Sequence, residues 1–355
     1  MKMKLFLLPV TMLFAVVTPS EAQTESPFDS VQQIKEVVIS TTRIPEMKSN
    51  AAASVTIIDH NQIAAMAKIA PDMSKLLGLL TPGMALSSNT TSSRSQSLRG
   101  RSALILIDGI PQSTPLRSTD RDIRTIDVSA IDHIEVVKGS TALYGNGAIG
   151  GLINIITKKD VTGKSIAGQT SLSGSTYNFF RQKRGQGYRL NQQLYGTVGK
   201  FDYLVNGAFG RTGSSVDGSG QFISPRYGLG DTYTTNALVK LGYALSPKNR
   251  LEFMYNFYRS LQDTKLIPSA GKYLQKPAIG ILGNKDPQAV DEGTRYNHNS
   301  YLKFTSRELF SHTDFEASIF GSSLYPIFDF RKANPAQPRW EGTSGQSAVK
   351  DRKFG

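Results

Sequence analysis

The feature that most constrains the fold is an alternation of apolar and polar residues through the second half of the chain, from residue 165 to residue 323. Successive side chains of a β-strand point to opposite faces of a sheet, so each alternating segment predicts a strand with one apolar and one polar face. About seven such strands are expected. The clearest are 188–198, 201–210, 232–243, 251–257, 298–305 and 315–320.

The connections between these strands are expected to alternate in length. Outer-membrane barrels combine strands of this pattern with short turns on one side and long loops on the other, whereas a soluble β-sandwich needs no such rule. The pattern therefore favours an antiparallel transmembrane β-barrel over a β-sandwich. Tight connections are predicted near 199–201, 246–250 and 308–313, and long ones at 174–187, 211–230 and 260–294. Aromatic residues suited to membrane interfaces stand at strand ends: Tyr188, Phe201, Tyr203, Tyr233 and Tyr243.

The N-terminus has the pattern of a secretory signal peptide. Lys2 and Lys4 precede an apolar run at 5–17, and a small-residue step ends at Ala22, where cleavage is expected. The run is shorter than the ~20 residues that a membrane-spanning helix needs. Residues 1–22 are therefore predicted to direct export.

Composition argues against several kinds of chemistry. The chain has no cysteine, and its four histidines show no metal-ligand spacing, so disulfides, thiolate catalysis and a metal site are not expected. The formal net charge of +13 falls by one when the leader is removed, and no nucleic-acid partner is predicted. Because Asp120 and Asp122 have no His or Cys partner at catalytic spacing, no catalytic residue and no enzyme activity are predicted.

Residues 43–160 have the pattern of a compact α+β domain. A strand at 54–58 precedes a helix that Asp59 can cap, and a second helix is expected to begin at Pro71. Asp108-Gly109 has the sequence of a two-residue hairpin turn. Further strands are predicted at 103–107, 133–138 and 152–157.

Three glycines, Gly145, Gly147 and Gly150, fall at the G-x-G-x-x-G spacing of dinucleotide-binding proteins. That motif needs a strand before the first glycine and a helix after the last one. Here a polar segment precedes the motif and the β-branched run GLINIITK follows it. The glycines are therefore expected to serve tight bends and close packing.

The segment Glu36-Val37-Val38-Ile39-Ser40-Thr41 is a short β-prone run with polar flanks. Two interpretations remain open from its pattern alone. It is either the first strand of the domain that follows, or a segment kept extended so that it can add as a strand to the sheet of another protein.

Several motifs together identify a resemblance. Residues 131–159, IDHIEVVKGSTALYGNGAIGGLINIITKK, and residues 98–111, LRGRSALILIDGIP, resemble the plug domain of TonB-dependent outer-membrane receptors, and EVVIST resembles a TonB box. In this family a 22-stranded barrel follows the plug. The resemblance implies a lead with the box at 23–42, a plug at 43–160 and part of a barrel at 161–355.

The resemblance also implies a function, which is capture of a ferric siderophore at the bacterial outer membrane and its import when TonB, energised by its inner-membrane complex, pulls on the box. The receptor is expected to act as a monomer in outer-membrane lipid, without a cofactor, and iron enters as part of the ligand. The residues implied to bind TonB are Glu36, Val37, Val38, Ile39, Ser40 and Thr41.

Two polar plug loops are implied to face the ligand, and the arginines in them suit forked contacts with anions, although a solvated charged loop is the simpler interpretation. The ligand candidates are Arg94, Gln112, Arg117 and Arg121, with Arg181, Lys183 and Arg184 adding positive charge outside. Contacts between plug and barrel wall are implied for Arg99, Glu135 and Lys138. The family commonly has Arg at the position of Lys138. A Lys ammonium makes a weaker contact with a carboxylate than the two-pronged contact of an Arg guanidinium.

The plug motifs 121–136, TALYG and GGLIN resemble those of receptors for hydroxamate or citrate-hydroxamate siderophores. Cobalamin, haem and polysaccharide-derived ligands are the alternatives. A signalling receptor is a further alternative, but such family members carry an additional domain before the box, where this sequence has only residues 23–35.

The alternation stops after about seven strands, and residues 324–355 are expected to begin an extracellular loop. The chain ends Lys353-Phe354-Gly355 rather than on a terminal aromatic residue. A half-barrel with two free edges leaves backbone groups unpaired in lipid. We therefore expect a partial sequence of a longer receptor, and a product of this length would be nonfunctional.

Overall fold

The computed structural model describes residues 38–39, 46–47, 54–89, 96–112, 123–142, 144, 147–159, 164–177, 183–225, 229–309, 313–331 and 345–355. The chain divides into two units, residues 1–36 and residues 37–355. All described residues belong to the second unit. The expected signal peptide lies outside them.

The predicted plug contains a five-stranded mixed sheet in the order β3-β6-β7-β4-β5. Strands β4 and β7 are parallel, and the other neighbours are antiparallel. Asp108 and Gly109 form the predicted hairpin turn, both with positive φ (49° and 83°), as a type I′ turn requires. The strands are β3 (Ser54–Ile58), β4 (Ala103–Ile107), β5 (Ile110–Pro111), β6 (Ile131–Lys138) and β7 (Gly151–Thr157), and the short helix η2 spans Val128–Ala130.

Two helices, α1 (His60–Ala67) and α2 (Met73–Leu80), pack on this sheet through side chains such as Leu76 and Leu77, which are fully buried. Asp59 caps α1 as predicted, accepting a 2.9 Å hydrogen bond from the Gln62 backbone N–H. The second helix begins later than Pro71, because the Asp72 carboxylate caps it by accepting from the Lys75 N–H. In the part of the chain that the structure describes, no helix is long and apolar enough to cross a membrane.

The glycine motif opens a strand, as predicted. Gly151 is the first residue of β7 and has φ +135°, and a Cβ there would lie 2.1 Å from the Val137 carbonyl oxygen. A Cβ on Gly150 would lie 2.7 Å from the Leu98 carbonyl oxygen. These glycines let three backbone segments approach closely, which is the packing role expected from the sequence.

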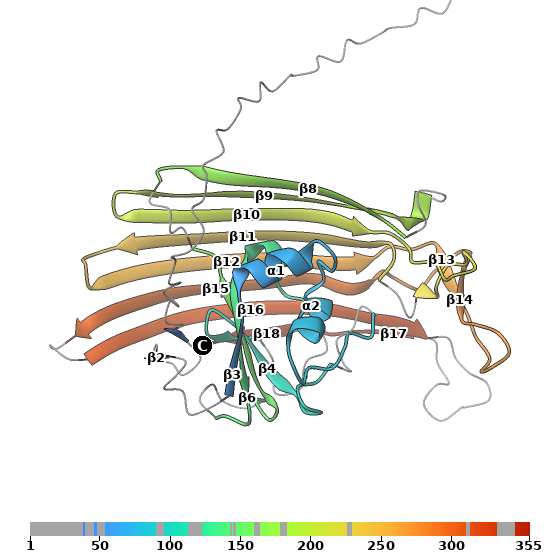
Figure 1. Cartoon of the computed structure of the whole chain (residues 1–355), viewed down its shortest axis with the longest axis horizontal. Coiled ribbons are helices and arrows are strands. Elements are labelled where there is room, and N and C mark those ends of the chain that lie inside the picture. The colour runs from blue at the N-terminus through green and yellow to red at the C-terminus, as the bar shows by residue number, and fades with distance from the viewer. Residues whose placement is uncertain are drawn as a thin grey trace, which may run out of the picture. The chain divides into compact units, whose positions relative to one another are not determined.

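Seven long strands follow and form one antiparallel sheet, here called the wall, in which sequence neighbours lie side by side (Figure 1). Connections alternate between short and long, with two residues between β9 and β10 and nineteen between β10 and β11. The predicted architecture is confirmed. The strands are β8 (Ala167–Thr176), β9 (Gln186–Val198), β10 (Phe201–Thr212), β11 (Thr232–Ala244), β12 (Asn249–Gln262), β15 (Glu292–Leu309) and β16 (Thr313–Arg331), and the long connections carry η3 (Lys183–Gly185) and the hairpin β13 (Leu266–Ser269)–β14 (Ile279–Leu282).

The expectation that residues 324–355 begin a loop is wrong for the residues described. Strand β16 continues to Arg331, and the chain returns as β17 (Gly345–Ala348) and β18 (Asp351–Phe354), both antiparallel to β16. Ladder hydrogen bonds to the exposed edge of β16 stabilise two segments that are too short to show an alternation of their own.

The two faces of the wall differ in polarity. Aromatic residues lie near both ends of the strands. Phe201 is opposite Tyr243 at one end, and Tyr188 and Tyr233 lie on either side of Arg211 at the other. Apolar side chains on one face are exposed, among them Leu172, Leu190, Leu194, Val198, Val205, Phe209, Phe253, Leu302 and Ile319. The opposite face is mainly polar and is buried.

Val38–Ile39 forms a two-residue strand, β1, which pairs with β2 (Glu46–Met47). This pair is separate from the five-stranded plug sheet. The interpretation of the segment as the first strand of the plug sheet is therefore not supported for the two residues of it that the structure describes.

We predict that Gly151→Ala destabilises the fold much more than Gly139→Ala. Both glycines have positive φ, but a Cβ on Gly139 would meet nothing within 4 Å, so Gly139→Ala carries backbone strain alone, on the order of 1–2 kcal/mol. The clash with Val137 should add at least about 2 kcal/mol. Urea unfolding of the chain refolded in detergent measures both, and equal losses would contradict the packing role of Gly151.

Candidate functional site

The candidate site is the interface between the plug and the buried face of the wall. Six asparagines occupy this face on five neighbouring strands, and each is at most 6% exposed. We call them the asparagine belt. Its members are Asn191 on β9, Asn206 on β10, Asn236 on β11, Asn256 on β12, and Asn297 and Asn299 on β15.

The belt binds the plug segment that precedes β6, and every second residue of that segment makes a contact. The Asn256 amide donates to the Thr125 carbonyl oxygen at 2.8 Å, and the Asp127 N–H donates to Asn236 Oδ1 at 3.2 Å. The Asn191 amide donates to Ser129 Oγ at 2.9 Å. Residues 125, 127 and 129 therefore face the wall together. Since these amides are buried, each bond to the plug also avoids an unsatisfied polar group.

Asp127 adds an ion pair to this contact. Arg189 on β9 forks onto its carboxylate, with Nη1 2.7 Å from Oδ2 and Nη2 on Oδ1. Burial alone would raise the pKa of Asp127, but the Arg189 guanidinium and hydrogen bonds from Ser129 hold it below its usual value. The pair is therefore ionised at neutral pH.

A second ion pair forms at the predicted hairpin turn. The Asp108 carboxylate accepts from Lys240 Nζ on β11 at 2.9 Å, and from the Thr157 hydroxyl at 2.6 Å and its N–H at 2.9 Å. The Tyr301 hydroxyl of β15 lies 2.9 Å from Asp108 Oδ2 and 2.7 Å from Glu252 Oε1 of β12. We call these five residues the Asp108 clasp.

The environment of Asp108 fixes its charge. Burial alone would raise the pKa of this carboxyl group, but the Lys240 ammonium and the two hydrogen bonds from Thr157 bring it down to about 2. The Lys303 ammonium also donates to the Asp108 carbonyl oxygen at 3.1 Å. Wall strands β11 and β15 thus hold one turn of the plug directly, and β12 supports them through Glu252.

The three residues predicted to contact the wall lie elsewhere in the plug. Arg99 is exposed and has φ +54°, and its N–H donates to the Gly83 carbonyl oxygen. Glu135 is 1% exposed and accepts from the Asn154 amide at 3.3 Å, and Lys138 is half-buried at the end of β6. Their wall contacts remain predictions.

His133 lies between Asp132 and Glu135 on β6, with Nδ1 2.7 Å from Asp132 Oδ2 and Nε2 3.4 Å from Glu135 Oε1. Burial lowers the pKa of His133, but its hydrogen bonds to the two carboxylates outweigh this effect and raise it to about 9. The contacts of Glu135 named here are therefore made within the plug, including one to a charged imidazole.

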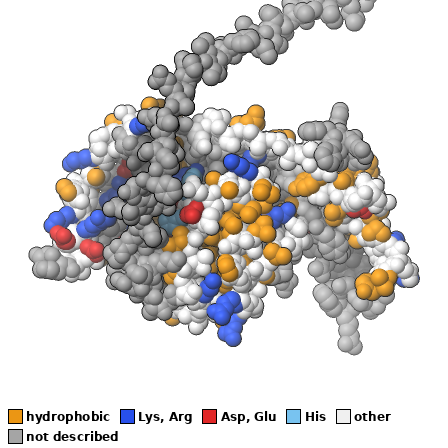
Figure 2. Space-filling view, viewed as in Figure 1, with side chains coloured by type: hydrophobic (Ala, Val, Ile, Leu, Met, Phe, Trp, Pro, Cys, Tyr) orange, Lys and Arg blue, Asp and Glu red, His pale blue; other side chains and the backbone are white. Residues whose placement is uncertain are grey.

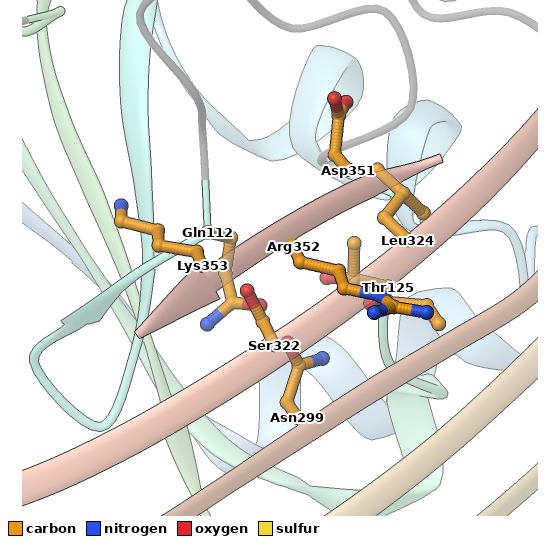
Figure 3. Close-up of a pocket in the computed structure, with 9 residues that line it drawn as sticks. Gln112, Thr125, Asn299, Ser322, Leu324, Asp351, Arg352 and Lys353 are labelled. Atoms are coloured by element: carbon orange, nitrogen blue, oxygen red, sulfur yellow. The ribbon is translucent and has the colours of Figure 1, made fainter. Parts of the chain in front are cut away.

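Of the predicted ligand residues, Arg94, Arg117 and Arg121 lie outside the described residues. Gln112 is buried, and its amide donates to the Ile110 carbonyl oxygen at 3.1 Å. It lines a cavity of about 10 Å³, room for one water, at the β15 end of the belt (Figure 3). The side-chain nitrogen of Asn297 and both side-chain polar atoms of Asn299, which line this cavity, have no hydrogen-bond partner.

The other predicted residues are only partly described. Glu36, Val37, Ser40 and Thr41 of the expected box lie outside the described residues, as do Arg181 and the side chain of Lys183. Arg184 belongs to the first long connection, and its Nη1 lies 3.7 Å from Asp231 Oδ2. Among the described residues, no group of three or more His, Asp or Glu side chains could hold a metal ion.

The clasp and the belt were missed from the sequence. A usable signal was present, because Lys240 and Glu252 are charged residues on the polar face of predicted barrel strands. Such a face needs a polar partner when it is buried. The spacing of Asn residues on that face was visible too, but the pattern does not say which plug residues they bind.

The geometry defines an α+β plug held by ion pairs and amides to the polar face of a barrel wall. Residues 47–152 match the family model of the TonB-dependent receptor plug domain. The chain is 29% identical to the rhizobactin receptor of Rhizobium meliloti (strain 1021), over 83% of this chain and 39% of that receptor. It is 34% identical to the ferric aerobactin receptor of Klebsiella pneumoniae, over 34% of this chain and 16% of that receptor.

A solved structure of the ferric enterobactin receptor of Pseudomonas aeruginosa has the same fold, with a TM-score of 0.55 and 21% identity over 90% of this chain and 47% of that one. The chain therefore contains a TonB-dependent receptor plug domain. It spans less than half of the length of the receptors that it matches.

We predict that Asp108→Asn weakens the attachment of the plug. The change removes one of the two carboxylates that pair with the buried Lys240 ammonium and leaves only Glu252, whose Oε1 lies 3.5 Å from Nζ. Removing one partner of a buried ion pair costs about 3–5 kcal/mol, and the remaining carboxylate should keep the loss at or below the lower end of that range. Hydrogen exchange of the β4 and β5 amides measures the loss. Asp217→Asn, on a half-buried residue of the long connection between β10 and β11, is the matched control and should leave the exchange unchanged.

We also predict that acid releases the Asp108 turn. Because the folded pKa of Asp108 is about 2, below the usual 3.8, its contribution of about 2 kcal/mol is complete above pH ~4 and is lost as the pH falls toward 2. Hydrogen exchange of the turn between pH 6 and pH 2 tests this. Asp108→Asn should flatten the response, and an identical profile for both proteins would contradict the assignment.

Proposed function

We propose that the chain forms the plug and the first wall strands of a receptor that imports a ferric siderophore across the outer membrane. The observation that carries the proposal is the seating of the plug, which is bound by ion pairs and amides to the polar face of a wall whose other face is apolar. In this arrangement the plug would block the pore of a membrane barrel and could be displaced from it. The names of the matched receptors, for rhizobactin and ferric aerobactin, support a siderophore as the ligand.

The proposed ligand belongs to the hydroxamate or citrate-hydroxamate class, as the plug motifs at 121–154 suggest. Arg94, Gln112, Arg117 and Arg121 would bind it from the plug loops. The protein carries out transport without covalent catalysis or a cofactor of its own. The leader at 1–22 would be cleaved after export.

Part of the plug surface that the described wall leaves uncovered is apolar, which is evidence for a wall with more strands. Hydrophobic side chains gather around α1 and α2 (Figure 2), where Ile69, Leu79 and Leu86 are 82%, 57% and 68% exposed. Apolar groups of this size gain stability when they are removed from water. We propose that further strands of the complete receptor cover this face and pair with the open edges of the wall.

TonB is the proposed energy-coupling partner, and residues 36–41 its binding segment. Only six residues separate β2 from β3, so a pull on residues 36–41 would reach the plug sheet through a short stretch of chain. The force would then act on the belt and the clasp, which hold the later part of the plug.

Deleting residues 36–41 from the complete receptor should abolish energy-dependent uptake of a radiolabelled ferric siderophore and leave binding to whole cells unchanged. An equally long deletion of residues 24–29 is the control and should leave both intact. Uptake that persists without residues 36–41 would overturn the assignment of the box. Loss of binding as well would show that the deletion damages the receptor.

A further inference from the structure

A second and larger cavity, of about 260 Å³, lies between the start of α2 and the ends of β8–β12 that adjoin the long connections. The plug contributes Lys75, Arg124 and Asp127 to its lining, and the wall contributes Arg189, Thr232 and Tyr258. On the expected topology, in which long connections are extracellular, the cavity lies on the outer side of the asparagine belt.

The lining of this cavity is positively charged. Five of its residues are cations and two are anions: Lys68, Lys75, Arg124, Arg189 and Arg211 against Asp72 and Asp127. The two anions pair with two of these cations, since Arg124 Nε lies 2.7 Å from Asp72 Oδ2 and Arg189 forks onto Asp127, and Arg211 Nη2 lies 2.5 Å from Oδ1 of Asp231, which is outside the lining. The surplus positive charge is therefore carried by Lys68 and Lys75. A concave site with a surplus of one sign concentrates ions of the opposite sign.

Two groups that can donate in this lining have no partner. The Thr232 hydroxyl is buried, with the residue 4% exposed, and makes no hydrogen bond. The half-buried Lys75 ammonium forms no ion pair or hydrogen bond among the described residues, although its backbone N–H is used to cap α2. A buried hydroxyl is normally satisfied, so both groups suit an acceptor that enters the cavity.

We propose that this cavity binds a carboxylate, with Lys75 and Thr232 as its donors and Lys68 as a further positive charge. The inference rests on the proposed function, because it makes the cavity the place where a carboxylate-bearing arm of the ferric chelate lies beside the plug. A volume of 260 Å³ is below the ~300–1,000 Å³ of sites that hold whole small molecules. It fits one arm or a small free acid.

The test uses citrate as an iron-free carboxylate probe and its trimethyl ester as the uncharged counterpart, titrated calorimetrically into the complete receptor. Citrate should bind and the ester should not. Lys75→Gln and Thr232→Val should each weaken citrate binding roughly tenfold, the effect expected for one hydrogen bond to a charged group. Thr232→Ser keeps the hydroxyl and should restore the affinity.

Two matched variants control for general effects. Thr235→Val makes the same chemical change at a neighbouring β11 position of opposite facing, and Arg259→Gln removes a charge from an exposed position on β12. Neither should alter citrate binding. Unchanged affinity in Lys75→Gln and Thr232→Val, or an equal loss in Arg259→Gln, would overturn the proposal.

Competition separates free acid from chelate. A ferric citrate-hydroxamate chelate should displace citrate from the receptor, and Lys75→Gln should weaken both ligands. If the receptor imports the chelate and the Lys75 and Thr232 variants have normal affinity, the cavity assignment fails and the proposed function stands. If citrate binding depends on both residues but no ferric chelate is imported, the proposed function fails and the carboxylate site stands.

Discussion

The structure depends on the need to pair the polar groups that one face of the wall buries. Lys240, Glu252 and the six belt asparagines all point to that face and are at most 7% exposed. An unpaired charge or amide in such a place is costly. For Lys240 and the asparagines of β9–β12, the plug meets this requirement with an acidic turn at Asp108 and with a segment, 125–129, that presents both backbone and side-chain groups. Asn297 and Asn299 keep polar atoms without a partner among the described residues. Plug and wall therefore supply hydrogen-bond and ion-pair partners to each other. The apolar residues Leu204, Leu238 and Met254 of the wall also pack against the hydrophobic core of the plug.

Much of this architecture could be predicted because its determinants are local. Alternation over ten or more residues specifies a barrel strand, and Asp108-Gly109 specifies a tight turn whatever surrounds it. The α2 start was placed too early because the Asp72 carboxylate, rather than Pro71, satisfies the first turn. The end of the alternation at residue 323 predicts a loop where the structure has strands. Strands β17 and β18 have four residues each and form only by pairing with the edge of β16, so no local sequence pattern predicts them.

The site could be predicted less well because its contacts join distant parts of the chain. Lys240 is 132 residues from Asp108, and Tyr301 is 193 residues from it. Residues chosen by resemblance, Arg99, Glu135 and Lys138, lie in the plug, and their wall contacts remain predictions. The described ion pairs between plug and wall that the sequence did not predict use Asp108 and Asp127. Which carboxylate meets which cation follows from strand register and plug orientation, and neither can be derived from one sequence.

Because the belt asparagines carry no charge, they affect how the plug segment at 125–129 can move along the wall. Each amide can both donate and accept, and residues 125 and 127 bind the belt through backbone groups that every residue carries, whereas residue 129 binds it through its hydroxyl. A plug segment that moves by two residues along the belt presents an equivalent set of backbone groups to the same amides. These backbone contacts therefore do not fix the register of the segment, and within the belt only the contact with the Ser129 hydroxyl depends on the side chain. Asp108 and Asp127, whose charges match single cations, supply the register, so breaking two ion pairs leaves a contact that can slide while its hydrogen bonds are exchanged one by one.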